Sequence, residues 1–237
     1  MQLSEQTIKL LKNFSNINSG IWIEQGNELV TTSKNKNIIA TAVIDNSFPN
    51  SFGIYDLNTL LSIFSLHKIT PELEFDKHNL IISGLSGRSK IKYRYCAEEM
   101  LVIPPKKRIE LPSNDIEFVL EEDDYKWICN AANILDSENI AITSDGTEVK
   151  LHVFDLKNDS AHNDALLIDV DPEGVKYNII FEFDLWNKLL EGSYEVTVYA
   201  NDLNSKNPIA MAKFVHRSME LEYVLLVHED STYEVQG

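Results

Sequence analysis

The feature that most constrains the fold is a proline-rich stretch near the middle of the chain. Residues 104–112 read PPKKRIELP, with three prolines and neither helical nor strand periodicity. Proline fixes its own backbone and disfavours helix in the residue before it, so this stretch favours an extended linker. We therefore predict two domains, residues 1–105 and 114–237, joined by a linker over residues 106–113.

The same order of elements is expected on both sides of this linker. Each half opens with a helix, continues with short strands, and places a second helix at an aromatic-Asp-Leu step, residues 55–57 and residues 183–185. Short β-branched segments with alternating polarity, separated by turn residues, favour antiparallel sheets over βαβ units. The predicted class is therefore α+β, with two similar domains that each combine antiparallel sheets with two helices.

Apolar periodicity predicts four helices, over residues 5–14, 57–64 and 124–134 and over a short segment between Asp184 and Gly192. Ser4, Asp56 and Asp184 stand where N-caps are expected, because their side chains accept hydrogen bonds from free helix N–H groups. The pairs Gly26-Asn27 and Asp145-Gly146 predict hairpin turns.

The charge balance bears on possible partners. The chain has 21 Lys and Arg residues against 37 Asp and Glu residues, a formal net charge of −16. Such a chain as a whole repels DNA. Salt, however, limits the reach of a surface charge to roughly 8 Å. What matters for DNA is therefore whether some surface lacks acids.

The outward faces of the four predicted helices are poor in acids, with Glu5 as an exception in a first turn. They carry Lys9, Lys12, Asn13 and Asn16; Asn58, Thr59, Ser62 and Ser65, with His67 and Lys68 at the helix end; Lys126, Asn130 and Asn133; and Asn187 and Lys188. A polar, solvated face explains any one helix. Four such faces in so acidic a chain favour contact with a phosphate backbone, which amides, hydroxyls and lysines make without reading bases.

Motifs for chemistry are missing from the sequence. There is no GxxxxGK[ST], GxSxG or HExxH pattern, and the six histidines lack ligand spacing. Cys96 and Cys129 stand far apart and form no CxxC motif, which favours buried thiols. We expect no enzyme activity, no cofactor and no metal. The first six residues do not resemble a signal peptide and no apolar run approaches about 20 residues, so the cytoplasm is the expected compartment.

Short stretches of the sequence resemble the sliding clamps of T-even-type bacteriophages. They are LLKNF at residues 10–14, INSGI at 17–21, IYDLN at 54–58 and NIAI at 139–142. The resemblance implies the DNA-clamp fold, with sheets outside and helices inside, and a homotrimer that closes head to tail around duplex DNA in the infected host cell. It also implies three kinds of protein partner: a clamp loader, the C-terminal peptide of a DNA polymerase, and late-transcription factors.

The resemblance also suggests site residues. It makes Lys9, Lys12 and Lys126 the leading candidates for phosphate contact, with Lys188, His67 and Lys68 as weaker ones. Asn130 and Asn133 stand where the resemblance implies arginines, so the DNA contact is expected to be light.

A partner-peptide pocket is expected near Ile109, Leu111, Val224 and Leu226, although ordinary packing explains each of these residues as well. Residues 106–108 (KKR) fit either a solvated loop or a contact with an acidic partner.

Other function classes remain open on the sequence. A non-enzymatic structural or interaction protein with tandem β-rich domains explains the strands and the acidity, but not the acid-poor helix faces. An acidic DNA mimic predicts carboxylates aligned on helix faces, where this chain has lysines and amides. A hydrolase with clustered acids lacks a recognisable constellation of catalytic residues.

Overall fold

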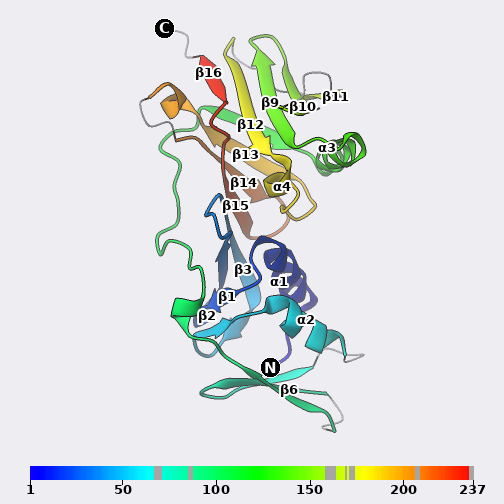
Figure 1. The fold of residues 1–237 in the computed structure, drawn as a ribbon, viewed down its shortest axis with the longest axis vertical. Helices are drawn as coiled ribbons and strands as arrows, with labels where there is room; N and C mark the ends of the chain where they lie inside the picture. Colours follow the sequence, from blue (N-terminus) through cyan, green and yellow to red (C-terminus); the bar gives the residue numbers. More distant parts are fainter. Residues whose placement is uncertain are drawn as a thin grey trace. The chain divides into compact units, whose positions relative to one another are not determined.

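The chain forms two compact units in a computed structural model, Met1–Lys107 and Arg108–Gly237 (Figure 1). The structure describes residues 1–66, 71–84, 88–157, 164–168, 170, 174–205 and 209–234. The division between the units falls within residues 106–113, the segment that we expected to be a linker.

The first unit combines two helices with short antiparallel strands. Its elements are α1 (Glu5–Ile17), β1 (Ile21–Ile23), β2 (Gly26–Thr32), β3 (Ile38–Phe48), β4 (Phe52–Ile54), α2 (Leu57–Ser65), β5 (Glu72–Phe75), β6 (Asn79–Ser83), β7 (Lys90–Arg94) and the 3-10 turn η1 (Glu98–Met100). Strand β1 pairs with β4, β2 with β3, and β5, β6 and β7 form a sheet in that order. Helix α1 packs on β3 and beside α2.

The start of α1 is fixed by side chains. Ser4 caps the helix as expected, with its hydroxyl accepting from the Thr7 N–H at 3.0 Å. The side-chain amide oxygen (Oδ1) of Asn46, on β3, accepts from the Ser4 N–H at 2.8 Å and from the Thr7 hydroxyl at 2.9 Å. These bonds satisfy free donors of the first turn and fix α1 to the sheet, so one apolar side of the helix is buried and the other faces outward.

The second unit is richer in strands. Its elements are β8 (Ile116–Leu120), α3 (Glu122–Leu135), β9 (Asn139–Asp145), β10 (Val149–Phe154), β11 (Asp164–Ile168), β12 (Lys176–Glu182), α4 (Phe183–Trp186), β13 (Tyr194–Tyr199), η2 (Asn201–Asn204), β14 (Met211–His216), β15 (Leu221–Leu226) and β16 (Thr232–Glu234). One sheet has the order β11-β10-β9-β12-β16, and β8, β13, β14 and β15 pair in that order. The pairings in both units are antiparallel, which confirms the predicted α+β class.

Helix α4 is shorter than expected and begins earlier. The chain passes directly from β12 into the helix, so Glu182 is the N-cap and Asp184 lies within the first turn. The prediction that Asp184 caps this helix was wrong. The reason is tertiary, since α4 is positioned by Trp186, which is fully buried with its ring 5.4 Å from Phe181 of β12 and 5.3 Å from Phe214 of β14.

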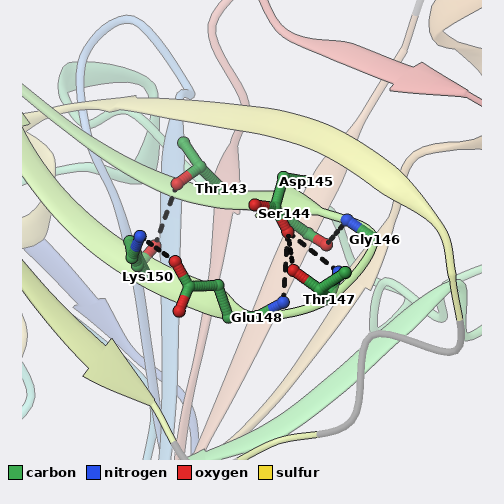
Figure 2. Close-up of polar contacts among 7 residues, drawn as sticks. All are labelled: Thr143, Ser144, Asp145, Gly146, Thr147, Glu148 and Lys150. Carbon is green, nitrogen blue, oxygen red and sulfur yellow. Dashed lines mark hydrogen bonds and ion pairs between the residues drawn. The ribbon is translucent and has the colours of Figure 1, made fainter.

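Of the two predicted hairpin turns, one is confirmed and the other was wrong. Asp145-Gly146 does join β9 to β10, and Figure 2 shows the turn. Gly146 has a φ of +92°, and the Asp145 carboxylate accepts from the Thr147 N–H at 2.8 Å and its hydroxyl at 2.6 Å. Gly26-Asn27 is not a hairpin turn, because β1 pairs with β4 while Gly26 already pairs with Phe48 of β3.

Candidate nucleic-acid interface

The outer face of α1 carries free positive charge. Lys9, Lys12 and Asn16 are exposed on this helix. In the part of the chain that the structure describes, neither lysine ammonium reaches a carboxylate. Asn13, which we expected on the same face, is instead buried, with 7% of its surface exposed. It follows Leu10 by three residues and so shares the packed side of the helix.

The face of α3 differs electrostatically from that of α1. The Lys126 ammonium lies 2.5 Å from a Glu122 carboxylate oxygen and 2.8 Å from one of Glu191. Hydrogen bonds to these two carboxylates raise the pKa of Lys126. Two negative charges thus more than neutralise the one lysine, which sequence alone had placed among the three leading candidates for phosphate contact.

The amides of α3 are exposed as expected, at Asn130 and Asn133. The Asn133 side-chain N–H donates to the Cys129 carbonyl at 2.8 Å, so part of its donor capacity is already used inside the helix. Asn130 therefore offers the freer amide. The arginine-poor face of α3 can contribute hydrogen bonds to a phosphate, but little charge.

The remaining two helices also offer little free charge. Two residues after α4, the Lys188 ammonium lies 2.9 Å from an Asp184 carboxylate oxygen and its side chain is only 21% exposed. On α2, the Ser62 and Ser65 hydroxyls donate to the carbonyls of Asn58 and Ser62, at 2.8 and 2.7 Å. These hydroxyl protons are not available to a phosphate. Lys68 and His67 lie outside the described residues.

The residues that sequence reasoning missed are the carboxylates around Lys126. Glu122 precedes Lys126 by four residues, a spacing that places the two side chains together on a helix and was available as a signal. Glu191 comes from the segment after α4, and only the tertiary structure brings it to Lys126. No group of three or more His, Cys, Asp or Glu side chains suited to a metal occurs among the residues described. No helix in the same residues has the length and apolarity to span a membrane.

The sequence of the chain is similar to those of known DNA replication proteins. A family model described as DNA polymerase processivity factor matches residues 4–103. The sliding clamp of Vibrio phage KVP40 is 28% identical, with 93% of this chain and 96% of the relative covered. That of Enterobacteria phage T4 is 29% identical over 99% of this chain and 100% of the relative. The chain is similar to the phage sliding clamps over nearly its whole length.

The fold of the chain agrees with its sequence similarity to the clamps. A solved structure of the C-terminal region of FEN-1 bound to A. fulgidus PCNA contains a chain that superposes with a TM-score of 0.63, at 12% identity, over 100% of this chain and 98% of that one. The predicted DNA-clamp fold is therefore confirmed. The comparisons support the function of a sliding clamp and processivity factor. Such clamps are non-enzymatic, in agreement with the prediction made from the missing catalytic motifs.

The four residues expected to line a partner-peptide pocket differ in how far their side chains are exposed. Ile109 and Leu111 are half-buried, and Leu226 is 42% exposed. Val224 lies two residues before Leu226 on β15 and so shares its face of the strand, but only 7% of its surface is exposed. Leu226 therefore offers the most apolar surface of the four residues.

Proposed function

We propose that three copies of this chain close head to tail into a ring that encircles duplex DNA and tethers the replicative DNA polymerase. The observation that carries the proposal is the similarity to sliding clamps over nearly the whole chain, with both units included. The ring acts in the cytoplasm of the infected host cell and does no chemistry. A clamp loader places it on DNA, and enclosure rather than tight binding retains it there.

The charge pattern supports weak contact with the duplex. Lys9 and Lys12 of α1 provide free charge, and the exposed amides of Asn16, Asn130 and Asn133 can donate to phosphate oxygens. Lys126 and Lys188 contribute less, since carboxylates hold their ammonium groups. We assign Asn13 no direct contact. A ring that must slide benefits from such light, sequence-independent contacts.

Open sheet edges support the head-to-tail closure. In the first unit, β7 is the last strand of the β5-β6-β7 sheet, and in the second unit β11 is the first strand of its sheet. An edge strand presents unpaired N–H and C=O groups to another chain. Strand β7 exposes Lys90, Lys92 and Arg94, while β11 exposes Leu167, at 60%. Each unit thus has at least one open edge, as a heterologous, ring-forming interface requires.

We further propose that the C-terminal peptide of the polymerase docks near Ile109, Leu111, Val224 and Leu226, and that late-transcription factors use the same face. A. fulgidus PCNA, which shares this fold, binds the C-terminal region of FEN-1. Leu226 is the most exposed of the four side chains and is the one expected to contact the peptide.

The test is synthesis on a primed single-stranded circle with the polymerase and clamp loader from the same genome. We expect full-length products only when the protein is present, because a tethered polymerase does not dissociate between nucleotides. A topological control follows the labelled protein on a nicked circle and on the same DNA made linear. A ring stays on the circle and runs off the ends of the linear form. Equal product lengths with and without the protein, or equal retention on both DNAs, would contradict the proposal.

A further inference from the structure

The second unit has a cavity that the proposed function does not use. Its volume is about 420 Å³, and it lies where α3 ends and where β12 passes into α4. Four carboxylates line it, those of Asp136, Glu138, Glu182 and Asp184. Asp136 directly follows the last residue of α3, where the carbonyl end of the helix dipole adds negative potential. We call it the second-unit cavity.

Two of the four carboxylates are free. Those of Glu138 and Asp184 have oxygens 2.6 and 2.9 Å from lysine ammonium groups. Among the described residues, no basic side chain pairs with the carboxylates of Asp136 and Glu182. The Nδ1 atom of His228, which also lines the cavity, accepts a backbone N–H at 3.3 Å, so this ring is uncharged. The cavity therefore has two unbalanced negative charges and favours a cationic ligand.

Two buried polar side chains in the wall lack hydrogen-bond partners. Asn139 is only 6% exposed, and its side-chain oxygen accepts from the Leu156 N–H at 3.2 Å. Its amide NH₂ group has no acceptor in the part of the chain that the structure describes. Ser137 is 5% exposed, and its hydroxyl has no partner in the same residues. Because buried polar groups are normally hydrogen-bonded, both point to a ligand that supplies the missing partners.

The rest of the wall offers apolar surface that is fixed in place. Leu156 and Phe183 line the cavity and are half-buried. The Phe183 N–H donates to the Glu138 carbonyl at 2.8 Å, which joins the start of α4 to the segment after α3. A planar cation stacks on an aromatic ring, and an alkyl stem packs against an aliphatic side chain.

These features fit an arginine residue better than other cations. A guanidinium has five N–H donors in one plane, enough for two carboxylates, whereas an ammonium is a compact and strongly hydrated charge. A polyamine has no acceptor for the Asn139 NH₂ group, while the backbone carbonyl of an arginine residue provides one. A metal ion requires more oxygen ligands than two carboxylates, and no group suited to a metal occurs among the residues described.

We propose that the second-unit cavity binds an arginine that a partner protein presents on an exposed loop. The guanidinium pairs with Asp136 and Glu182 and stacks on Phe183. The alkyl stem packs against Leu156, and the Asn139 NH₂ group donates to the backbone carbonyl of the arginine. The inference does not rest on ring closure, because every residue of the cavity lies in the second unit.

The experiment titrates the full chain, deuterated and ¹⁵N-labelled, with N-acetylarginine amide and follows the NMR cross-peaks. N-acetylcitrulline amide is the uncharged isostere of this probe, N-acetyllysine amide tests the ammonium, and propylguanidinium lacks the carbonyl. The variants are Glu182→Gln and Asp136→Asn. Asparagine tolerates the left-handed conformation of residue 136, whose φ is +52°. The matched control is Glu195→Gln, which neutralises an exposed carboxylate on β13.

We expect N-acetylarginine amide to shift the Asn139 side-chain cross-peaks saturably, and each cavity variant to weaken binding about fivefold, as for a partly exposed ion pair. Glu195→Gln should leave binding unchanged, and propylguanidinium should bind more weakly. Equal binding of the citrulline or lysine probe would overturn the assignment to arginine. Absence of saturable shifts in the cavity, or variants that bind like the unaltered protein, would overturn the site itself. Neither result bears on the tethering function, which the primed-circle assay decides separately.

Discussion

At the scale of single residues, the structure separates lysines that are free from lysines that are neutralised. Lys9 and Lys12 of α1 point away from the packed side of their helix and meet no carboxylate in the ranges described. Lys126 lies between Glu122 and Glu191, and Lys188 pairs with Asp184. The sequence ranked Lys126 with Lys9 and Lys12, and Lys188 below them, whereas the structure separates the four lysines by whether a carboxylate holds the ammonium.

This difference predicts the salt dependence of DNA contact. Each lysine that neutralises a phosphate contributes about 0.9 to the slope of log affinity against log salt. Replacing Lys9 and Lys12 by Ala should lower that slope by about 1.8 for each subunit whose two lysines contact phosphates, whereas Lys126→Ala should change it little. The slope is measured from the affinity of the protein for a short linear duplex at increasing salt, because enclosure retains a ring on a circle whatever the strength of its contacts. An equal loss from both sets of substitutions would show that the Lys126 charge is available after all.

A second residue-scale prediction concerns the turn in Figure 2. Hydrogen bonds from the Thr147 hydroxyl and N–H, and from the Glu148 N–H, lower the pKa of Asp145 to about 2. The folded carboxyl thus has a lower pKa than the unfolded one, so its stabilising contribution is present above pH 3.8 and is lost as the pH falls through 2.

The Asp145 prediction is checked by NMR titration of the carboxyl carbon. We expect a midpoint near 2 in the unaltered protein. Thr147→Ala removes the first of these donors and should raise the midpoint toward 3.8. A midpoint near 3.8 in both proteins would mean that the hydrogen bonds of the turn do not persist in solution.

At the scale of elements, two triplets of the same type have different roles. Residues 55–57 and 183–185 both have the aromatic-Asp-Leu pattern, yet Asp56 caps α2 while Asp184 lies inside α4. Caps and turns such as Ser4, Asp56 and Asp145-Gly146 were predictable, because their hydrogen bonds join residues close in sequence. The start of α4 was not, because it depends on the packing of Trp186 against Phe214 of β14, a strand distant in sequence, as well as against Phe181 of the adjoining β12.

The two aspartates should therefore differ in their effect on stability. Asp56→Ala removes a side chain that satisfies the Thr59 N–H, and such a loss costs about 1 kcal/mol of unfolding free energy. Asp184→Ala removes only an exposed ion pair, and we expect a change within about 0.5 kcal/mol. Urea unfolding of both variants tests this, with Asp56→Asn as a control that keeps a capping oxygen. Equal costs for the two alanine variants would refute the distinction.

At the scale of the whole molecule, what matters is how copies of the chain associate. The sequence predicted two domains and a clamp resemblance, but it could not indicate which strands end a sheet. That depends on strand pairing, which places β7 and β11 at open edges. The basic residues of β7 are typical of an edge strand, but the composition of β11 does not distinguish it from strands that pair on both sides.

Disruption of the β11 edge should therefore prevent assembly. Leu167→Arg places a charge on an exposed apolar side chain of this edge, and we expect sedimentation to show mainly monomers where the unaltered protein forms trimers. Leu66→Arg is the matched control, because Leu66 is also exposed but lies after α2. If both variants sediment as trimers, β11 is not part of the interface between subunits.

The two carboxylates around Lys126 have a consequence for motion along DNA. Each free cation that meets a phosphate adds a small barrier to every step of a ring along the duplex, so a neutralised lysine makes that path smoother. The positive charge is nevertheless still present and is only masked. Loss of both Glu122 and Glu191 would expose it, whereas loss of either one leaves the other carboxylate on the ammonium. In the proposed ring, diffusion speed would thus be adjusted through surface acids alone, while Lys126 is kept.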